Sequence, residues 1–315
     1  MKKIIFDLDV GVDDAMALIM AFYDPEIKIE LITTTFGNVG VDQATKNTCF
    51  VVDKYAKQKY PIYKGAEKGL NTPLHNAEEV HGKTGLGNKI VAEDVSTKPL
   101  NKKGYGAIEA MRDTILKNPN EITIVAVGPV TNVANLLTTY PEVKDKIERI
   151  ILMVGSVDGK GSITPYSSFN AYCDPNAVDI VIKSGVPISL TTKEIGTSAY
   201  FMETQRKRFA KINKAGEFMY DLCFGYVDKI LKANQYAVHD TCALFAMLDT
   251  DIFTRENVDM TINTTFDEKR GQTKFKANPN SHITLITSVN KKKLFKKMEE
   301  TLANGNEFLA EKYKN

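Results

Sequence analysis

Four carboxylates lie within eight residues near the start of the chain: Asp7, Asp9, Asp13 and Asp14. They separate an apolar run that predicts a strand from an apolar run that predicts a helix. Four like charges at one strand end repel one another unless a cation lies among them. A set of oxygen ligands suits a hard cation, Ca²⁺ or Mg²⁺, better than zinc. The spacing therefore predicts a metal site at the end of the first strand.

Two other interpretations of the acidic cluster stay open at this point. Asp13 or Asp14 could cap the following helix, because a carboxylate stabilises the positive end of a helix. Capping leaves Asp7 and Asp9 unexplained. A strand that ends in Asp-x-Asp also resembles Mg²⁺-dependent phosphatases of the haloacid dehalogenase type. Those enzymes carry Thr or Val-Thr at the place of Val10-Gly11 and lack the Asp-Asp pair that follows here, which weakens this alternative.

Further motifs follow the acidic segment Asp7–Ala15 in order along the chain. They are Thr34–Asn38, Val80–Leu86, Val127–Asn132, Ser168–Asn170 with Cys173–Pro175, and Val238–Asp240. Together these segments resemble the nucleoside hydrolase family of the inosine-uridine preferring, or ribonucleoside hydrolase, type, in which the first segment reads DxDxGxDDA. The resemblance covers the chain from Lys2 to about Phe245. It implies an enzyme of nucleoside salvage that uses water to split a ribonucleoside into free base and ribose.

The resemblance also implies which residues hold the metal and the ribose. Ca²⁺ would bind three carboxylates and one backbone carbonyl: those of Asp9, Asp14 and Asp240, and that of Val127. The 2′- and 3′-hydroxyls of the ribose and one water would complete its coordination. The side chains that would hydrogen-bond the ribose hydroxyls are those of Asp13, Asn38 and Asn170.

The expected chemistry suits these residue types. An N-glycosidic bond breaks through an oxocarbenium-like ribosyl cation, which nearby carboxylates stabilise. Coordination to a metal lowers the pKa of a bound water, and an adjacent carboxylate can take its proton. We assign Asp9 as the candidate for that base. The reaction requires no covalent nucleophile.

Two of the four histidines have a context that predicts a role in catalysis. His239 directly precedes Asp240 and could protonate or hydrogen-bond the departing base, since imidazole titrates in the useful range. The alternative is a structural histidine at a helix start. His81 lies in a glycine-rich stretch and matches a family position near the base; its alternative is a histidine on a surface loop. We expect His75 and His282 to be exposed to solvent.

Three aromatic side chains lie on the predicted helical stretch that leads to His239: Tyr220, Phe224 and Tyr226. In the family this region lines the nucleobase pocket, where aromatic rings can stack on the leaving base. A buried stripe on an ordinary helix is an equal alternative for each of them. The pattern therefore predicts aromatic contacts to the base without selecting one residue.

The segment Gly161–Asn170 departs from the family at two positions. Better-known members carry Asn at the place of Ser162 and Glu at the place of Ser168, and those residues bind the 5′-hydroxyl of the ribose. Two serines make this part of the pocket shorter and uncharged. We expect weaker discrimination at the 5′ position, so that 5′-deoxy and 5′-substituted ribosides are used comparatively well. The alternative is that another residue, such as Tyr166, restores the missing hydrogen bonds.

Strand-like and helix-like segments alternate through the first two thirds of the chain. The expected strands are Ile4–Leu8, Ile29–Thr35, Ile122–Val127, Ile150–Val154 and Ile188–Thr191. The expected helices are Asp14–Phe22, Val41–Tyr55, Tyr105–Leu116, Thr131–Leu137 and Asn176–Ser184. This rhythm predicts an α/β fold with a doubly wound, mostly parallel, Rossmann-like sheet, in which sites form at the carboxyl ends of the strands.

The last third of the chain has a different pattern. It predicts a helical stretch over Ala199–Leu231, a helix near Asp240, an appended hairpin of short strands over Val258–Thr287, and a closing helix over Lys291–Lys312. No linker or internal repeat is visible. We therefore expect residues 1–315 to form a single domain with a helical C-terminal portion.

Composition excludes several classes of protein. The 315 residues are 43% hydrophobic and 25% charged, which is typical of a globular protein with a full core. A net charge of +2 is too small to indicate nucleic acid as a partner. The apolar run at the start of the sequence is too short for a signal peptide. No window of the sequence resembles a transmembrane span, so we expect no membrane partner.

The cysteines and the family resemblance predict the thiol state, the assembly and the partner of the protein. Four scattered cysteines without a CxxC pair predict buried free thiols in a reducing cytoplasm. The resemblance alone implies a homodimer or homotetramer. The expected partner is a small-molecule nucleoside. A non-catalytic ribose- or nucleoside-binding protein remains the alternative from a different functional class.

Overall fold

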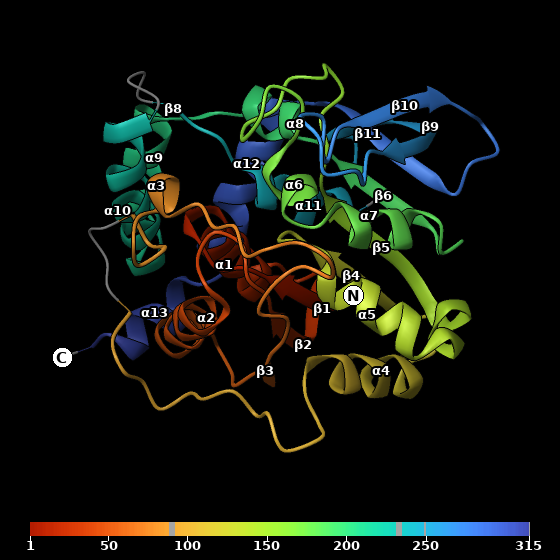
Figure 1. Cartoon of the computed structure of the whole chain (residues 1–315). Helices are drawn as coiled ribbons and strands as arrows, with labels where there is room; N and C mark the ends of the chain where they lie inside the picture. The colour runs from red at the N-terminus through yellow and green to blue at the C-terminus, as the bar shows by residue number, and fades with distance from the viewer. Residues whose placement is uncertain (88–91, 231–234, 249, 315) are drawn as a thin grey trace.

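The computed structural model describes residues 1–87, 92–230, 235–248 and 250–314, with the side chains of residues 224–230 left out (Figure 1). The strands are β1 (Lys2–Leu8), β2 (Ile27–Thr34), β3 (Ile62–Lys64), β4 (Ile122–Ala126), β5 (Ile147–Met153), β6 (Ile188–Thr191), β7 (Phe201–Met202), β8 (Gln235–Tyr236), β9 (Phe253–Ile262), β10 (Thr273–Ala277) and β11 (Ile283–Val289). The first helices are α1 (Val12–Tyr23), α2 (Val41–Tyr55), α3 (Glu78–His81), α4 (Ala107–Lys117), α5 (Thr131–Thr139), the 3₁₀ helix η1 (Pro141–Lys146), α6 (Phe169–Cys173) and α7 (Pro175–Ile182). The later ones are α8 (Lys193–Ser198), α9 (Glu203–Ala210), α10 (Lys214–Ile230), α11 (His239–Ala246), α12 (Lys291–Ala303) and α13 (Asn306–Lys312).

Within the described ranges, nine strands form one sheet in the order β10-β9-β11-β6-β5-β4-β1-β2-β3. Pairing is parallel from β3 to β11 and antiparallel for β11-β9 and β9-β10. The chain places β2 and β3 on one side of β1, and β4, β5 and β6 on the other. The strand order therefore reverses between β1 and β4, which is where ligands bind in open parallel sheets. The predicted doubly wound α/β fold is confirmed.

Alternation along the strands divides the core between the two faces of the sheet. Ile4, Phe6 and Leu8 of β1 pack into the core on the side of α1, α2 and α12. Ile5 and its neighbour Ile124 on β4 pack into the core on the side of α4, α5 and α7. Figure 1 shows these two helical groups on opposite sides of the sheet. Both faces are covered, so the strands are apolar almost throughout.

Helix α1 is buried on every side. All of its residues from Val12 to Tyr23 are buried, because α2, α10, α11 and α12 pack around it. A helix that is hydrophobic over most of its circumference occupies such a central position. Asp13 and Asp14 lie in its first turn, so their carboxylates are placed on a rigid element and away from bulk water.

The last third of the fold differs from the sequence-based expectation. The stretch Ala199–Leu231 contains the short strand β7 and two helices, and Leu231 itself lies outside the described residues. The strands expected over Val258–Thr287 are present, and β9 and β10 form an antiparallel hairpin. The hairpin is not appended as expected, since β11 pairs with β9 and in parallel with β6, so that all three strands extend the main sheet. The expected helix Lys291–Lys312 is two helices, separated at Asn304-Gly305. The short elements β3 and α8 were not expected.

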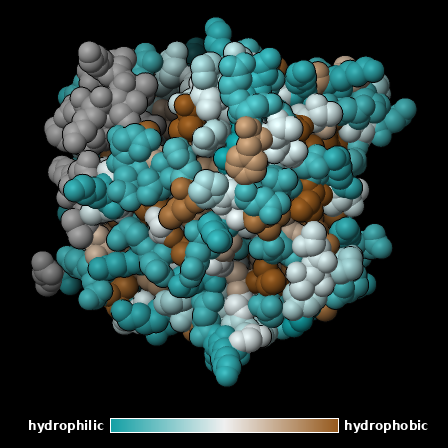
Figure 2. Space-filling view, viewed as in Figure 1, coloured by the Kyte–Doolittle hydropathy of each residue, from teal (hydrophilic) through white to brown (hydrophobic). Residues whose placement is uncertain are grey.

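The surface and the cysteines match the composition. The face seen in Figure 2 is mainly hydrophilic, with small and separate hydrophobic areas. All four cysteines are buried and carry free thiols, as expected. In the described part of the chain, no helix has both the length and the apolar character needed to cross a bilayer.

Candidate active site

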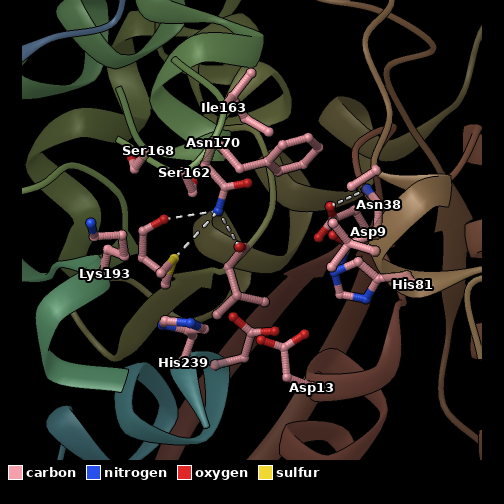
Figure 3. A pocket seen from close by; sticks show the side chains of 16 residues that line it. Asp9, Asp13, Asn38, His81, Ser162, Ile163, Ser168, Asn170, Lys193 and His239 are labelled. Atoms are coloured by element: carbon pink, nitrogen blue, oxygen red, sulfur yellow. Dashed lines mark hydrogen bonds between the residues drawn. The ribbon is translucent and has the colours of Figure 1, made fainter. Parts of the chain in front are cut away.

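A cavity of about 240 Å³ lies at the carboxyl ends of the central strands, where the strand order reverses. Of the residues that the resemblance assigned to the metal, the ribose, the 5′ position and the histidine roles, all but Asp14 line this cavity. They are Asp9, Asp13, Asn38, His81, Val127, Ser162, Ser168, Asn170, His239 and Asp240 (Figure 3). The fold thus gathers widely separated segments of the chain around one space.

Asp9 follows β1 directly, and its carboxylate is fixed by the ends of the neighbouring strands. Its Oδ2 accepts a hydrogen bond from the backbone N–H of Asn38 at 2.7 Å. Gly37 and Gly128 follow β2 and β4 and pack against the same carboxylate. A Cβ at Gly128 would lie 2.7 Å from Oδ1 of Asp9, and a Cβ at Gly37 would overlap Oδ2. The absence of side chains at these two glycines therefore leaves room for Asp9.

Asp14 lies beneath the cavity and organises the residues around it. Its Oδ1 accepts the backbone N–H of Asp9 at 3.2 Å, and its Oδ2 accepts the backbone N–H of Gly11 at 3.0 Å. The side-chain amide of Asn38 also donates to Oδ2, at 2.8 Å. The capping interpretation is thus correct for Asp14, which caps the start of α1. Capping does not account for the other acids.

Three buried carboxylates approach closely enough to share a cation. Oxygen atoms of Asp13, Asp14 and Asp240 all lie within 4.8 Å of one another. Burial, followed by the charge of Asp14, raises the pKa of Asp13 to about 8. Burial, followed by the charges of Asp13 and Asp14, raises the pKa of Asp240 well above its usual range. No lysine or arginine is among the largest influences on either pKa, so the donor set fits a divalent cation.

This group of three includes Asp13, which the resemblance assigned to the ribose instead of the metal. Asp9, an expected metal ligand, lies beside the group and shares the same cavity. All four acids therefore contribute negative charge to one small volume. Such a volume suits both a cation and a ribosyl group that becomes positive.

Asn170 and Val127 form the floor of the cavity. The side-chain amide of Asn170 donates to the backbone carbonyl of Val127 at 2.6 Å and to that of Met153 at 2.9 Å. Both amide protons are then used, and Oδ1 of Asn170 is the atom left to accept from a ligand. The carbonyl of Val127 keeps a second lone pair, as the expected contact to a metal requires.

Both histidines of the cavity are neutral. Burial, and then the nearby His239, lowers the pKa of His81 to about 3. Burial, and then the charge of Lys193, lowers the pKa of His239 to about 4. Nδ1 of His81 accepts the backbone N–H of Val12 at 3.3 Å, which leaves its proton on Nε2.

The same tautomer follows for His239. Its Nδ1 is buried, has no hydrogen-bond partner among the described residues, and faces Gly196, where a Cβ would overlap it. An unpaired buried N–H donor is rarer in proteins than an unpaired acceptor, so we assign the proton to Nε2. A neutral Nε2–H can donate a hydrogen bond to a departing base.

The loop of residues 155–168 connects β5 to α6 and covers the serine side of the cavity. Ser168 is buried, and its hydroxyl accepts the backbone N–H of Gly155 at 2.8 Å. Ser162 is exposed at the mouth. Thr273 on β10 holds the loop, since its hydroxyl accepts the N–H of Ser156 and donates to the carbonyl of Ser156, both at 3.0 Å.

Lys193 also lines the cavity, and sequence analysis missed it. It begins α8 directly after the strand β6, at the same carboxyl edge as Asp9 and Val127. Its position after a predicted strand was the available signal. Its proximity to the 155–168 loop depends on contacts that are distant in sequence, and no pattern reveals them.

Several other expectations are corrected or fall outside the described residues. His75 is half-buried against the rings of Phe169 and Tyr172, so the expectation that it is exposed is wrong. His282 is exposed, as expected, and its Nε2 lies 3.0 Å from the carbonyl of Ile182. Tyr220 does not line the cavity. The side chains of the other two aromatic residues, Phe224 and Tyr226, lie outside the described residues.

Comparisons with known proteins agree with the fold. A purine-preferring ribonucleoside hydrolase from Gardnerella vaginalis has the same fold, with a TM-score of 0.89 at 24% identity over 98% of this chain and 100% of that one. A plant nucleoside hydrolase has a TM-score of 0.88 at 26% identity over 96% of this chain and 99% of that one. The non-specific ribonucleoside hydrolase RihC of Salmonella paratyphi C is 33% identical over 271 residues, 86% of each chain.

The family model for inosine-uridine preferring nucleoside hydrolases matches residues 4–296, which include every acid, amide and histidine of the cavity. The match extends well beyond the motifs near the start of the chain and includes the strands that extend the main sheet. The chain belongs to the inosine-uridine preferring nucleoside hydrolase family and is an enzyme.

Proposed function

We propose that the enzyme hydrolyses the N-glycosidic bond of ribonucleosides in a Ca²⁺-dependent reaction that releases free base and ribose. The observation that carries this proposal is the set of buried carboxylates on one side of a cavity that also holds two neutral histidines. Clustered carboxylates suit a metal and a ribosyl cation. Neutral N–H donors suit a leaving heterocycle. The relatives named as ribonucleoside hydrolases support the same substrate class.

The metal would be held by Asp9, Asp14, Asp240 and the carbonyl of Val127, with Asp13 adjacent. The oxygen-only donor set favours Ca²⁺ over zinc. When bound, Ca²⁺ supplies a fixed position for the ribose diol and a water of lowered pKa.

The chain's own groups perform the remaining tasks. Asp13 and Oδ1 of Asn170 accept hydrogen bonds from the ribose hydroxyls and fix the sugar in the cavity. Asp9 has one oxygen held by the N–H of Asn38, and its other oxygen is the candidate to take a proton from the attacking water. The assembled carboxylates stabilise positive charge on the ribosyl group as the bond to the base breaks.

The direct test is to incubate the protein with Ca²⁺ and a panel of purine and pyrimidine ribonucleosides, and to measure free base and reducing sugar. Release of both in equal amounts supports the proposal. Two alternatives give different results. A phosphatase releases phosphate from phosphomonoesters and leaves nucleosides intact, and a binding protein retains the nucleoside without cleaving it.

Replacing His239 by alanine tests its contact with the leaving base. We expect kcat/KM for inosine and uridine to fall by about 10²-fold or more, because the departing base loses a hydrogen-bond donor. The same variant should hydrolyse p-nitrophenyl riboside at close to the wild-type rate, since that leaving group needs no proton. An equal loss on both substrates would assign His239 a structural role beside Asp240.

Assembly and location also follow from the sequence as predictions. A homodimer or homotetramer is expected, and light scattering on the purified protein gives the mass in solution. A cytoplasmic location is expected, and fractionation of the producing cells tests it.

A further inference from the structure

One end of the active-site cavity carries a positive charge that the proposed reaction does not use. Lys193 lines the cavity, and its side chain is only 20% exposed. Among the described residues that line the cavity, Lys193 is the one lysine or arginine. A partly buried ammonium beside a substrate pocket is costly to desolvate unless an anion or strong acceptors face it.

Backbone contacts place Lys193 next to the two serines. Its N–H donates to the carbonyl of Gly155 at 3.1 Å, and the N–H of Gly155 donates to the hydroxyl of Ser168 at 2.8 Å. Figure 3 shows Lys193, Ser162 and Ser168 on one side of Asn170, with His81 and Asn38 on the other. The lysine and the serine hydroxyls therefore belong to one end of the cavity.

The ammonium group of Lys193 is only partly engaged. Nζ donates to the carbonyl of Lys160 at 2.6 Å, and the nearest carboxylate, that of Asp158, is 4.0 Å away. That carboxylate instead accepts the N–H of Lys160 at 2.8 Å. Glu194 is turned toward the N–H of Val157, at 3.2 Å. Within the described chain, Nζ makes these two contacts, so that at least one of its three N–H donors can bind a ligand.

The two ends of the cavity suit different parts of a ribonucleoside. If the diol lies on the carboxylates, the base at C1′ and the 5′ carbon at C4′ project in different directions. Ala77 and Val80 beside the His81 ring form an apolar wall, which suits a planar base. Hydroxyls and a cation suit a polar or anionic 5′ group.

We propose that the Lys193 end of the cavity binds an anionic group on the 5′ carbon, so that the enzyme also hydrolyses ribonucleoside 5′-monophosphates. This inference rests on the proposed N-glycosidase function. Water adds to C1′, the C1′–N bond breaks, and the base leaves with a proton. The phosphate ester is untouched, and the products are free base and ribose 5-phosphate.

The test compares inosine and uridine with their 5′-monophosphates, with products identified as base and ribose 5-phosphate so that a contaminating phosphatase is recognised. The quantity to follow is the ratio of kcat/KM for the monophosphate to kcat/KM for the nucleoside. Lys193→Met should lower this ratio about tenfold to a hundredfold, the range for a lost hydrogen bond to a charged group. Lys160→Met removes an equal charge from an exposed side chain of the same loop and should change the ratio less than about threefold.

A second variant should change this ratio of kcat/KM values in the opposite direction. Asp158→Asn keeps an acceptor for the N–H of Lys160 and removes the carboxylate nearest to Lys193. It should raise the ratio by about twofold to threefold, an effect that damage to the loop would not produce. For the wild type, ribose 5-phosphate should inhibit more strongly than ribose. The difference should shrink when salt is raised from about 0.02 M to about 0.5 M, because screening weakens charge pairs at the cavity mouth.

The outcomes separate this inference from the proposed function. If neither nucleosides nor monophosphates are cleaved, the proposed function fails. If nucleosides are cleaved while monophosphates are not, and ribose 5-phosphate inhibits no better than ribose, only the inference is overturned. A Lys193→Met variant that loses activity equally on both substrates also overturns it and assigns Lys193 to the base. Should that variant not fold, the salt dependence of wild-type inhibition decides.

Discussion

Asp14→Ala should reduce kcat/KM for every ribonucleoside by roughly 10³-fold or more. The substitution removes a carboxylate of the buried acidic group and also the acceptor for Gly11, Asp9 and Asn38. Asp14→Asn separates the two effects, because it keeps an acceptor of the same shape and removes only the charge. We expect both variants to lose activity, which would identify charge as the main requirement.

The same variants have a readout that is independent of activity. Ca²⁺ that binds only the native state at about 100 times its Kd stabilises a protein by about 2.7 kcal/mol. Adding Ca²⁺ to chelator-treated wild type should therefore raise Tm and restore turnover, and the Tm shift should be absent in Asp14→Asn. Asp7→Asn is the matched control: Asp7 is a buried acid on β1 that lies outside the group formed by Asp13, Asp14 and Asp240, and it should retain the shift. A normal Ca²⁺ response in Asp14→Asn would refute the metal site.

A 2′-deoxyribonucleoside should be hydrolysed with a kcat/KM lower by about 10⁴-fold than the matching ribonucleoside. A site built around a hydroxyl rejects its absence because buried polar groups are left unpaired. Here those groups are the carboxylate of Asp13 and Oδ1 of Asn170, both in a cavity with few other partners. The measurement compares kcat/KM for uridine and for 2′-deoxyuridine under the same conditions.

The 5′-deoxy analogue is the matched control for this substrate series. It also lacks one hydroxyl, but at the end of the cavity where the serines lie, so its loss should be much smaller. Similar kcat/KM values for uridine and 2′-deoxyuridine would contradict the placement of the diol on the acids. Equal large losses for both deoxy analogues would show that the serine end binds the 5′-hydroxyl tightly. That result would contradict the weak 5′ discrimination predicted from Ser162 and Ser168.

The sequence predicted the acidic part of the cavity because its determinants are local. Asp9 follows a short apolar strand, and Asp14 begins an apolar helix, so strand and helix patterns alone bring both to one end of the sheet. Resemblance added Asp240 and Asn170, which lie far away in the chain. No pattern indicated that Asp13 approaches Asp240 within the same group of acids, since that distance depends on the packing of α11 against α1.

The errors have physical reasons of the same kind. Tertiary packing determines which strand pairs with β11. The alternation of apolar and polar residues along β11 therefore did not show that it would pair with β6. The three residues of β3 are too few for a period to be visible. Asn304-Gly305 between α12 and α13 is a helix-stop signal that could have been read from the sequence. The burial of His75 depends on Phe169 and Tyr172, neither of which is a sequence neighbour.

The hydrogen bonds between Thr273 and Ser156 have a consequence for how this enzyme can diverge. They tie the loop above the serine end of the cavity to the antiparallel edge of the sheet, while the acids are fixed by the first turn of a central helix and by parallel strand ends. Selection can therefore act on substrate range and on catalysis through separate sets of residues. Changes in β10, or in the turn that precedes it, would move the loop and alter which ribosides enter. The buried acids would be inherited unchanged.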